Sequence, residues 1–133
     1  MTTKHGAQTP RDLLATYVKR VAEGDVAGIV GSYAADAVVT LPCGREAAGL
    51  QAIGVAFGAA VASGAALPVD DSVVDGARVI ETGSLSMVSF TDLDGAVRTM
   101  VAWRGEDGWA WVRDGSMLRD VEAALDTGLV DVA

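Results

Sequence analysis

The stretch from Trp109 to Ala124, WAWVRDGSMLRDVEAA, contains the pattern that decides the fold. As far as Ser116 its residues are typical of a β-strand, with large apolar side chains in alternation. Beyond that point Leu118, Val121 and Leu125 recur at helical spacing and predict a short amphipathic helix. The stretch therefore predicts a final strand of a sheet, followed by a helix that closes one end of it.

Further β-rich runs precede this strand, and Asp-Gly pairs separate them. The predicted strands are Val69–Val74, Val79–Phe90, Val97–Arg104 and Trp109–Ser116, with turns at Asp75-Gly76, Asp94-Gly95 and Asp107-Gly108. An Asp-Gly pair between two β-rich runs is a strong short-range signal for a hairpin. The second half of the chain is therefore predicted to be an antiparallel meander.

The first half of the chain has helical periodicity. Thr9-Pro10 predicts the start of a helix that ends at Glu23-Gly24, and Asp25 predicts the cap of the next. The remaining predicted elements are a second helix from Val26 through Tyr33 that stops near Ala35-Asp36, a β segment at Val38–Leu41, and a third helix at Glu46–Ser63.

Helices followed by a sheet predict an α+β domain. We expect a cone-shaped α+β barrel, with three N-terminal helices packed on a curved antiparallel sheet and a short C-terminal helix. Residues 1–8 are expected to form a flexible tail, residues 9–128 a single domain, and residues 129–133 a C-terminal tail.

The charge of the chain excludes several kinds of partner. Ten Lys and Arg against eighteen Asp and Glu give a formal net charge of −8, which disfavours nucleic acid and anionic membrane surfaces. The charge-free stretch Ala47–Val69 is mostly Ala and Gly with one larger apolar face, which favours a buried helix over a membrane span. The single cysteine, Cys43, and an N-terminus without a signal peptide favour a cytoplasmic protein. The sequence contains no His/Cys metal motif or phosphate-binding loop, so we expect neither metal nor cofactor.

Two segments resemble a known superfamily. Tyr17–Pro42, YVKRVAEGDVAGIVGSYAADAVVTLP, resembles the opening of nuclear-transport-factor-two-like proteins, which include ketosteroid isomerase, SnoaL-like polyketide cyclases and limonene epoxide hydrolase. Arg113–Ala124 is similar to the end of limonene epoxide hydrolase. The resemblance implies a SnoaL-like domain that encloses an apolar pocket for a small hydrophobic molecule.

The resemblance also points to catalytic residues. Asp114 matches the catalytic acid of the epoxide hydrolases, and Tyr17 matches the phenolic donor of the isomerases. The general base of the isomerases would fall at Leu41, and their second acid within Val97–Trp103, which contains no Asp or Glu. The leading hypothesis is a cofactor-independent acid–base enzyme of the isomerase, cyclase or epoxide hydrolase type. The alternative is a non-catalytic small-molecule-binding or dimerisation module of the same fold.

Two-residue turns at Asp94-Gly95 and Asp107-Gly108 would fix which strand residues share a face. Asp114 would then lie on the concave face among apolar side chains, where desolvation raises the pKa of a carboxyl group. Together with two residues from the helical half, the predicted ligand-binding residues are Trp103, Ser84, Ser86, Val88, Phe90, Val101, Val112, Tyr33 and Phe57. Asp114 could instead bond the amides of the following helix, and the tyrosines could be core residues.

The opposite face of this predicted sheet is also apolar. It carries Trp109, Trp111 and Met87, which the three helices cannot cover if they lie on the concave face. A second copy of the chain is the simplest cover, so we expect a homodimer through this outer face.

Overall fold

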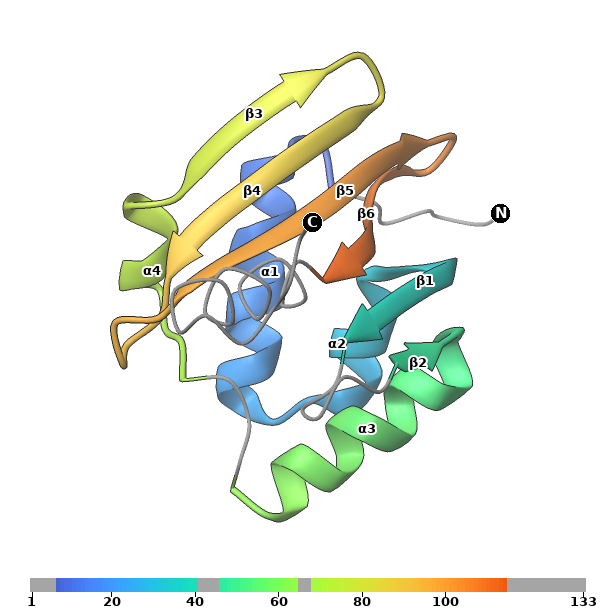
Figure 1. Ribbon diagram of the computed structural model, residues 1–133, viewed down its shortest axis with the longest axis vertical. Coiled ribbons are helices and arrows are strands. Elements are labelled where there is room, and N and C mark those ends of the chain that lie inside the picture. Colours follow the sequence, from blue (N-terminus) through green and yellow to red (C-terminus); the bar gives the residue numbers. More distant parts are fainter. Residues whose placement is uncertain (1–6, 41–45, 65–67, 115–133) are drawn as a thin grey trace, which may run out of the picture.

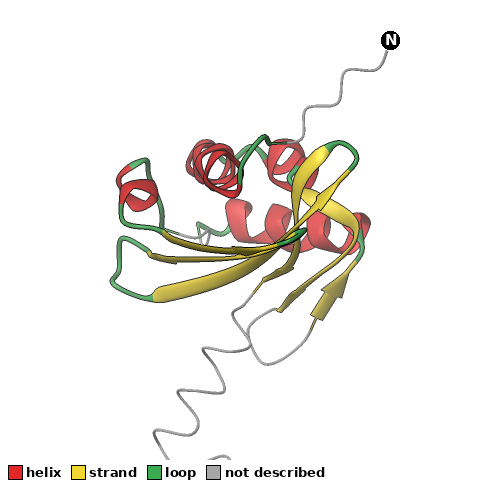
Figure 2. Cartoon of the chain, turned by 90° about the horizontal axis from the view of Figure 1, so that it is seen from above, coloured by secondary structure: helices red, strands yellow, loops and turns green. Residues whose placement is uncertain are grey.

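The computed structural model describes residues 7–40, 46–64 and 68–114, and the predicted C-terminal helix lies outside them. The helices are α1 (Pro10–Glu23), α2 (Val26–Gly31), α3 (Leu50–Ala62) and α4 (Ser72–Asp75). The strands are β1 (Tyr33–Thr40), β2 (Glu46–Ala48), β3 (Arg78–Thr82), β4 (Leu85–Thr91), β5 (Val97–Gly105) and β6 (Gly108–Asp114). They form one curved sheet in the order β2-β1-β6-β5-β4-β3, with the helices on one face (Figures 1 and 2). The α+β class is confirmed, and the sheet is open.

The caps of the first two helices are confirmed. Thr9 Oγ1 accepts a hydrogen bond from the Asp12 amide at 3.0 Å, and Asp25 Oδ1 accepts one from the Gly28 amide at 3.0 Å. Between them, α1 ends at Gly24, whose φ of 68° is the left-handed conformation that glycine adopts without strain. These local signals fix how α1 and α2 enter and leave the core.

The second helix ends earlier than predicted, and Tyr33 begins β1 instead. The Ser32 hydroxyl donates to the Ile29 carbonyl at 2.6 Å, and the Ser32 carbonyl accepts from the Trp111 amide at 2.9 Å. Ser32 thus ends the helix and begins the pairing of β1 with β6. That pairing is parallel, and the other four pairings of the sheet are antiparallel, as predicted.

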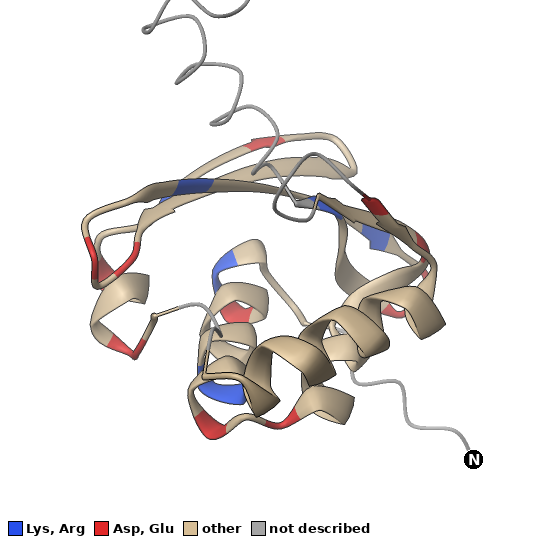
Figure 3. Cartoon of the chain, turned by 60° about the horizontal axis from the view of Figure 1, so that its bottom comes forward, with Lys and Arg blue, Asp and Glu red and all other residues tan. Residues whose placement is uncertain are grey.

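The start of the predicted third helix is a strand. Glu46–Ala48 forms β2, which pairs with β1, and α3 begins only at Leu50. Figure 3 shows that the sheet arches over the helices. It also shows that α3 carries no charged side chain. Within the described part of the chain, no helix combines the length and the apolar character that crossing a membrane requires.

The predicted strand Val69–Val74 is wrong, because a short helix occupies its end. Asp70 Oδ1 accepts a hydrogen bond from the Ser72 amide at 2.9 Å, which forms a turn at the start of α4, and Gly76 ends that helix rather than forming a hairpin. The predicted single strand Val79–Phe90 is divided at Gly83, whose φ of 60° allows a tight turn between β3 and β4.

The β4–β5 connection is longer than the Asp94-Gly95 pair predicts. Thr91 pairs with Val97, so the loop comprises residues 92–96. The buried Asp92 carboxylate organises this loop, accepting from the Asp94 and Ala96 amides at 2.9 Å each and from Arg98 Nε at 3.0 Å. This loop length reverses the predicted alignment of the faces of β4 and β5.

The change of register exchanges most of the predicted faces. The helix-covered face of β4, β5 and β6 carries Ser86, Val88, Phe90, Met100, Ala102, Trp109 and Trp111, all of them buried. Trp109 and Trp111 are therefore core residues, and their predicted place on the outer face is wrong. Trp103 is 46% exposed and lies on the outer face with Val101 and Leu85, opposite to its predicted position.

A β-bulge in β6 adds a second change of register. Ala102 pairs with Trp111, but Val101 pairs with Arg113, so Val112 is the additional residue. Beyond the bulge the backbone of Asp114 pairs with Met100. The side chain of Asp114 lies outside the described part of the structure.

Candidate functional site

Four aromatic side chains meet between the sheet and the helices. Tyr17 comes from α1, Tyr33 from the start of β1, Phe57 from α3 and Trp111 from β6. The Tyr17 ring makes edge-on contacts with the other three, at centroid distances of 6.0 Å to Tyr33, 6.5 Å to Phe57 and 5.7 Å to Trp111. The structure thus brings together three residues that the sequence proposed for a site, and adds Trp111. We call these four residues the aromatic cluster.

The two phenols of the aromatic cluster are hydrogen-bonded to each other. Tyr17 Oη and Tyr33 Oη are 3.1 Å apart, and both side chains are buried. A phenol hydroxyl both donates and accepts, so such a pair can present a donor to an oxygen that develops negative charge. Their burial also makes them core residues, as the alternative interpretation of the sequence has it.

Two buried polar atoms near the middle of the sheet have no hydrogen-bond partner among the described residues. They are Ser86 Oγ and Trp111 Nε1. Ser86 and Trp111 occupy one row across the sheet, on either side of Ala102, which pairs with both. An unsatisfied buried polar group costs about 1–3 kcal/mol. Such groups are rare in native proteins and call for an explanation, of which a ligand is one.

The other predicted ligand-binding residues separate into two groups. Val88 and Phe90 are buried on the helix-covered face, as predicted. Ser84 lies in the exposed turn between β3 and β4, where its carbonyl accepts from the Arg104 amide at 2.8 Å. The remaining residues, Val101, Trp103 and Val112, belong to the outer side of the sheet and do not join the aromatic cluster.

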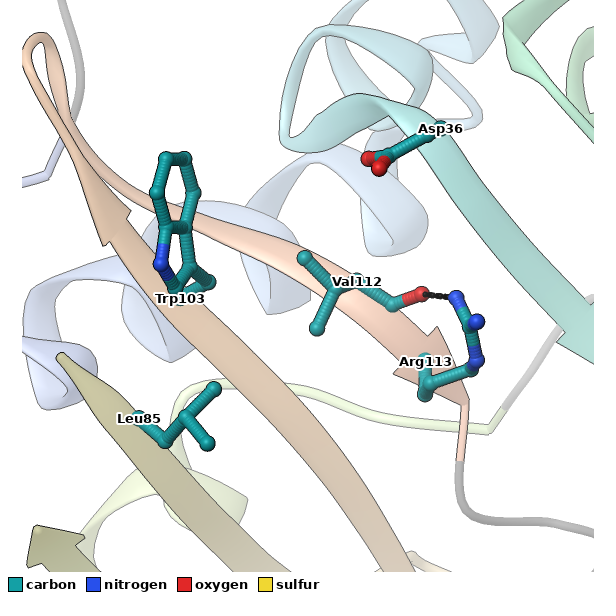
Figure 4. Close-up of a pocket in the computed structure, with 5 residues that line it drawn as sticks. All are labelled: Asp36, Leu85, Trp103, Val112 and Arg113. Atoms are coloured by element: carbon teal, nitrogen blue, oxygen red, sulfur yellow. Dashed lines mark hydrogen bonds between the residues drawn. The ribbon is translucent and has the colours of Figure 1, made fainter.

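A depression opens on the outer side of the sheet, with a volume of about 440 Å³. Its lining residues are Asp36, Leu85, Trp103, Val112 and Arg113 (Figure 4). The depression lies where the pairing of β1 with β6 is irregular. Tyr33 pairs with Trp111 and Val38 pairs with Arg113, so the segment between the paired positions is longer on β1 than on β6. The strands separate there, and Asp36 on β1 faces Val112 and Arg113 on β6 across the gap. We call this feature the outer pocket.

Buried charge in the described residues is confined to the β4–β5 loop. Asp92 is the one buried acidic side chain among them, and it is 1% exposed in its ion pair with Arg98. Burial alone would raise the pKa of Asp92, but hydrogen bonds from the Ala96 amide, the Arg98 guanidinium and the Asp94 amide lower it overall. No group of three or more His, Cys, Asp or Glu in the described ranges is placed to hold a metal ion.

Comparison with known proteins identifies the fold. No family model and no curated protein matches the chain. A candidate calcium/calmodulin-dependent protein kinase type II association domain from Thiobacillus denitrificans is 15% identical, with a TM-score of 0.63 over 83% of this chain and 94% of that one. A nuclear-transport-factor-two-like protein with a cystatin-like fold from Novosphingobium aromaticivorans is 20% identical, with a TM-score of 0.60 over 78% and 75%.

A third solved structure is described as a candidate dehydratase of the nuclear-transport-factor-two-like family, from Streptomyces avermitilis. It is 17% identical, with a TM-score of 0.61 over 77% of this chain and 87% of that one. At such identities the likeness concerns the fold. The chain therefore has the nuclear-transport-factor-two-like fold, as its sequence resemblance predicted.

Proposed function

We propose that this protein binds a small, neutral, largely apolar molecule beneath its sheet and acts on it by acid–base chemistry without a cofactor. The observation that carries the proposal is the hydrogen-bonded pair of Tyr17 and Tyr33 inside the aromatic cluster. The fold is one in which a neighbouring solved structure is described as a candidate dehydratase. Isomerase, cyclase and hydrolase chemistry remain the proposed reaction types.

The donors around the aromatic cluster define the chemistry of the ligand. Phenol, indole and hydroxyl groups are neutral and pair with a carbonyl or hydroxyl oxygen. The ring edges favour a flat apolar body, because aromatic groups prefer edge-on or offset contacts. Phe57 is the half-buried member of the cluster, so we place the entry of the ligand beside it on α3.

Asp114 remains the proposed proton-transfer group. The β-bulge at Val112 sets the register in which its backbone pairs with Met100, a buried residue of the helix-covered face. Bulges occur often beside active sites, where they redirect the residues that follow. Tyr17 is proposed to stabilise negative charge that develops on the ligand oxygen.

The alternative function is a binding module without catalysis. It is favoured by the use of Asp92, the one buried acid among the described residues, to build a loop far in sequence from the aromatic cluster. No described carboxylate is then left to serve as a base inside the core. The two functions share the ligand site and differ only in the role of Asp114.

The homodimer also remains a proposal, with corrected interface residues. Of the eight large hydrophobic residues exposed among the described ones, five lie on the outer face of β3, β4 and β5. They are Ile80, Leu85, Met87, Val97 and Trp103. Met87 keeps its predicted place in the interface, whereas Trp109 and Trp111 leave it.

Titration with a matched pair of probes tests the ligand site. A neutral bicyclic enone should bind at least about tenfold more tightly than a carboxylate built on the same ring system, because the site offers no described cation. Tyr17→Phe should weaken binding of the enone about tenfold, the value of one hydrogen bond. Trp103→Phe, on the outer face, should leave it unchanged. Equal binding of both probes, measured by NMR titration, would contradict the proposal.

Asp114→Asn separates the enzyme from the binding module. Once a substrate is found among such enones, the variant should lower turnover by about 100-fold or more while the Kd for the ligand stays within about threefold. Single-turnover assays together with the NMR titration measure both quantities. Unchanged turnover would remove Asp114 from the reaction and leave the binding module as the function.

A further inference from the structure

The outer pocket is lined by apolar side chains and by two opposite charges. Leu85, Trp103 and Val112 supply the apolar surface. The Asp36 carboxylate lies on the β1 side and the Arg113 guanidinium on the β6 side (Figure 4). The volume of about 440 Å³ falls within the range of about 300–1,000 Å³ that is typical of small-molecule sites. The outer pocket therefore has room for a small molecule, on the side of the sheet opposite to the aromatic cluster.

The indole ring of Trp103 forms one wall of the outer pocket, and Gly105 gives that ring its position. The two residues are two positions apart on β5 and so lie on the same face of the sheet. A Cβ placed on Gly105 would lie 2.6 Å from Trp103 Cζ3 and 3.1 Å from Trp103 Cη2, so the ring lies directly over the glycine. Because Arg113 pairs with Val101, on the other side of Trp103 along β5, the ring leans away from the charged end of the pocket. This leaning position keeps the floor of the pocket open.

The backbone determines where the two charges of the outer pocket lie. Asp36 belongs to the segment of β1 between its two paired positions, which is longer than the facing segment of β6. On β6 the bulge at Val112 precedes Arg113, whose Nη1 donates to the Val112 carbonyl at 2.8 Å. That hydrogen bond uses one of the five guanidinium N–H groups and holds the side chain at the rim of the pocket (Figure 4). A negative and a positive charge thus lie on opposite sides of an apolar floor.

We propose that the outer pocket binds a small zwitterion with an apolar body, of which an apolar α-amino acid is the simplest example. The Asp36 carboxylate accepts hydrogen bonds from the ammonium group of this ligand. The Arg113 guanidinium donates to the ligand's carboxylate, whose planar shape matches the guanidinium fork. The apolar body covers Leu85 and Trp103. This site is separate from the ligand site proposed at the aromatic cluster and does not depend on its chemistry.

A zwitterion fits the outer pocket better than a simple anion or cation. The formal net charge of −8 repels an anion as it approaches, and a cation meets the positive charge of Arg113. A zwitterion has no net charge, and each of its ends meets a group of opposite sign. The apolar surface gives the rest of the ligand its contact, since Leu85 is 52% exposed and Trp103 is 46% exposed beside the two charges.

A matched series of three probes tests this site. Phenylalanine, phenethylamine and hydrocinnamate share the phenyl ring and its two-carbon arm, and only phenylalanine carries both charges. Phenylalanine should bind at least about threefold more tightly than either analogue, the value of one solvent-accessible ion pair. NMR titration of the isotope-labelled full chain measures each Kd, at a protein concentration below that at which copies associate, so that no second copy competes for Leu85 and Trp103.

The same spectra show where the probe binds. The indole N–H signal of Trp103, on the outer face, should move with added phenylalanine, and that of the buried Trp111 should not. Movement of the Trp111 signal without the Trp103 signal would place the probe at the aromatic cluster and contradict the inference.

Neutral variants assign the two charges to the two ends of the ligand. Arg113→Gln should weaken phenylalanine binding to the level of phenethylamine, and Asp36→Asn should weaken it to the level of hydrocinnamate. Both positions are exposed, so the fold is retained. Arg78→Gln, the same substitution at an exposed position of the edge strand β3, is the matched control and should change none of the three Kd values. Undetectable binding of phenylalanine, equal binding of the three probes, or an equal effect of each variant on all three would overturn the inference. None of these results bears on the aromatic cluster, which Tyr17→Phe tests.

Discussion

Trp111→Ala should lower the free energy of unfolding by about 3–5 kcal/mol, the cost of emptying a large buried site. The Trp111 side chain is fully buried, and its ring meets Tyr17 at 5.7 Å in the aromatic cluster. Ala102, which pairs with Trp111 on β5, is too small to occupy the space that the ring leaves. Urea denaturation followed by circular dichroism measures the change.

Trp103→Ala is the matched control for this experiment. Trp103 is 46% exposed on the outer face, so the same substitution should cost no more than about 1 kcal/mol. Unfolding should be followed at several protein concentrations, because an effect that acts through association of two copies changes with concentration. A larger loss at Trp103 than at Trp111 would mean that the faces of the sheet are the reverse of those in the structure.

Asp92→Ala should lower the free energy of unfolding by about 3 kcal/mol near pH 7, because it leaves the β4–β5 loop without its organising acceptor. The carboxylate accepts from two amides and from Arg98, and removing it leaves those donors without a partner in the loop. Asp94→Ala, in the same loop but exposed, is the matched control and should cost less than about 0.5 kcal/mol.

The effect of Asp92 should depend on pH in one direction. Its folded-state pKa is lowered, so its contribution to stability is fully present above the unfolded-state pKa of about 3.9. The contribution is lost as the pH falls from that value through the lower folded-state pKa. The difference in stability between the wild type and Asp92→Ala should therefore shrink when urea denaturation is repeated near pH 3. A constant difference would show that the charge of Asp92 plays no part.

Local chemistry was predictable from the sequence. Thr9, Gly24 and Asp25 were identified correctly because capping depends only on residues within one helical turn. Helical periodicity shows which side of a helix is apolar, so it predicts correctly that Tyr17 and Phe57 lie inside, whereas Tyr33 lies inside as a residue of β1 and not of the predicted helix. The general architecture of helices followed by a meander emerged from the same kind of signal.

The faces of the sheet were not predictable in the same way. A change of one residue in loop length moves every side chain to the opposite face. The loop that Asp92 organises is longer than a two-residue turn, and the bulge at Val112 shifts the register of β5 with β6. The pattern of Asp-Gly pairs predicts neither feature. One signal does favour the observed arrangement, since Trp109 and Trp111 are the largest residues of β6 and large apolar side chains stabilise a fold most when they are buried.

The parallel pairing of β1 with β6 has a consequence for folding kinetics. It joins residue 33 to residue 111, whereas β3 to β6 pair with their neighbours through short turns. Closing so long a loop carries an entropic cost that local hairpins avoid, and non-local pairing slows folding. The four-stranded meander can therefore assemble first, with the helical half docking on it afterwards. During synthesis, β1 and β2 must wait for the ribosome to release β6 before they can join the sheet.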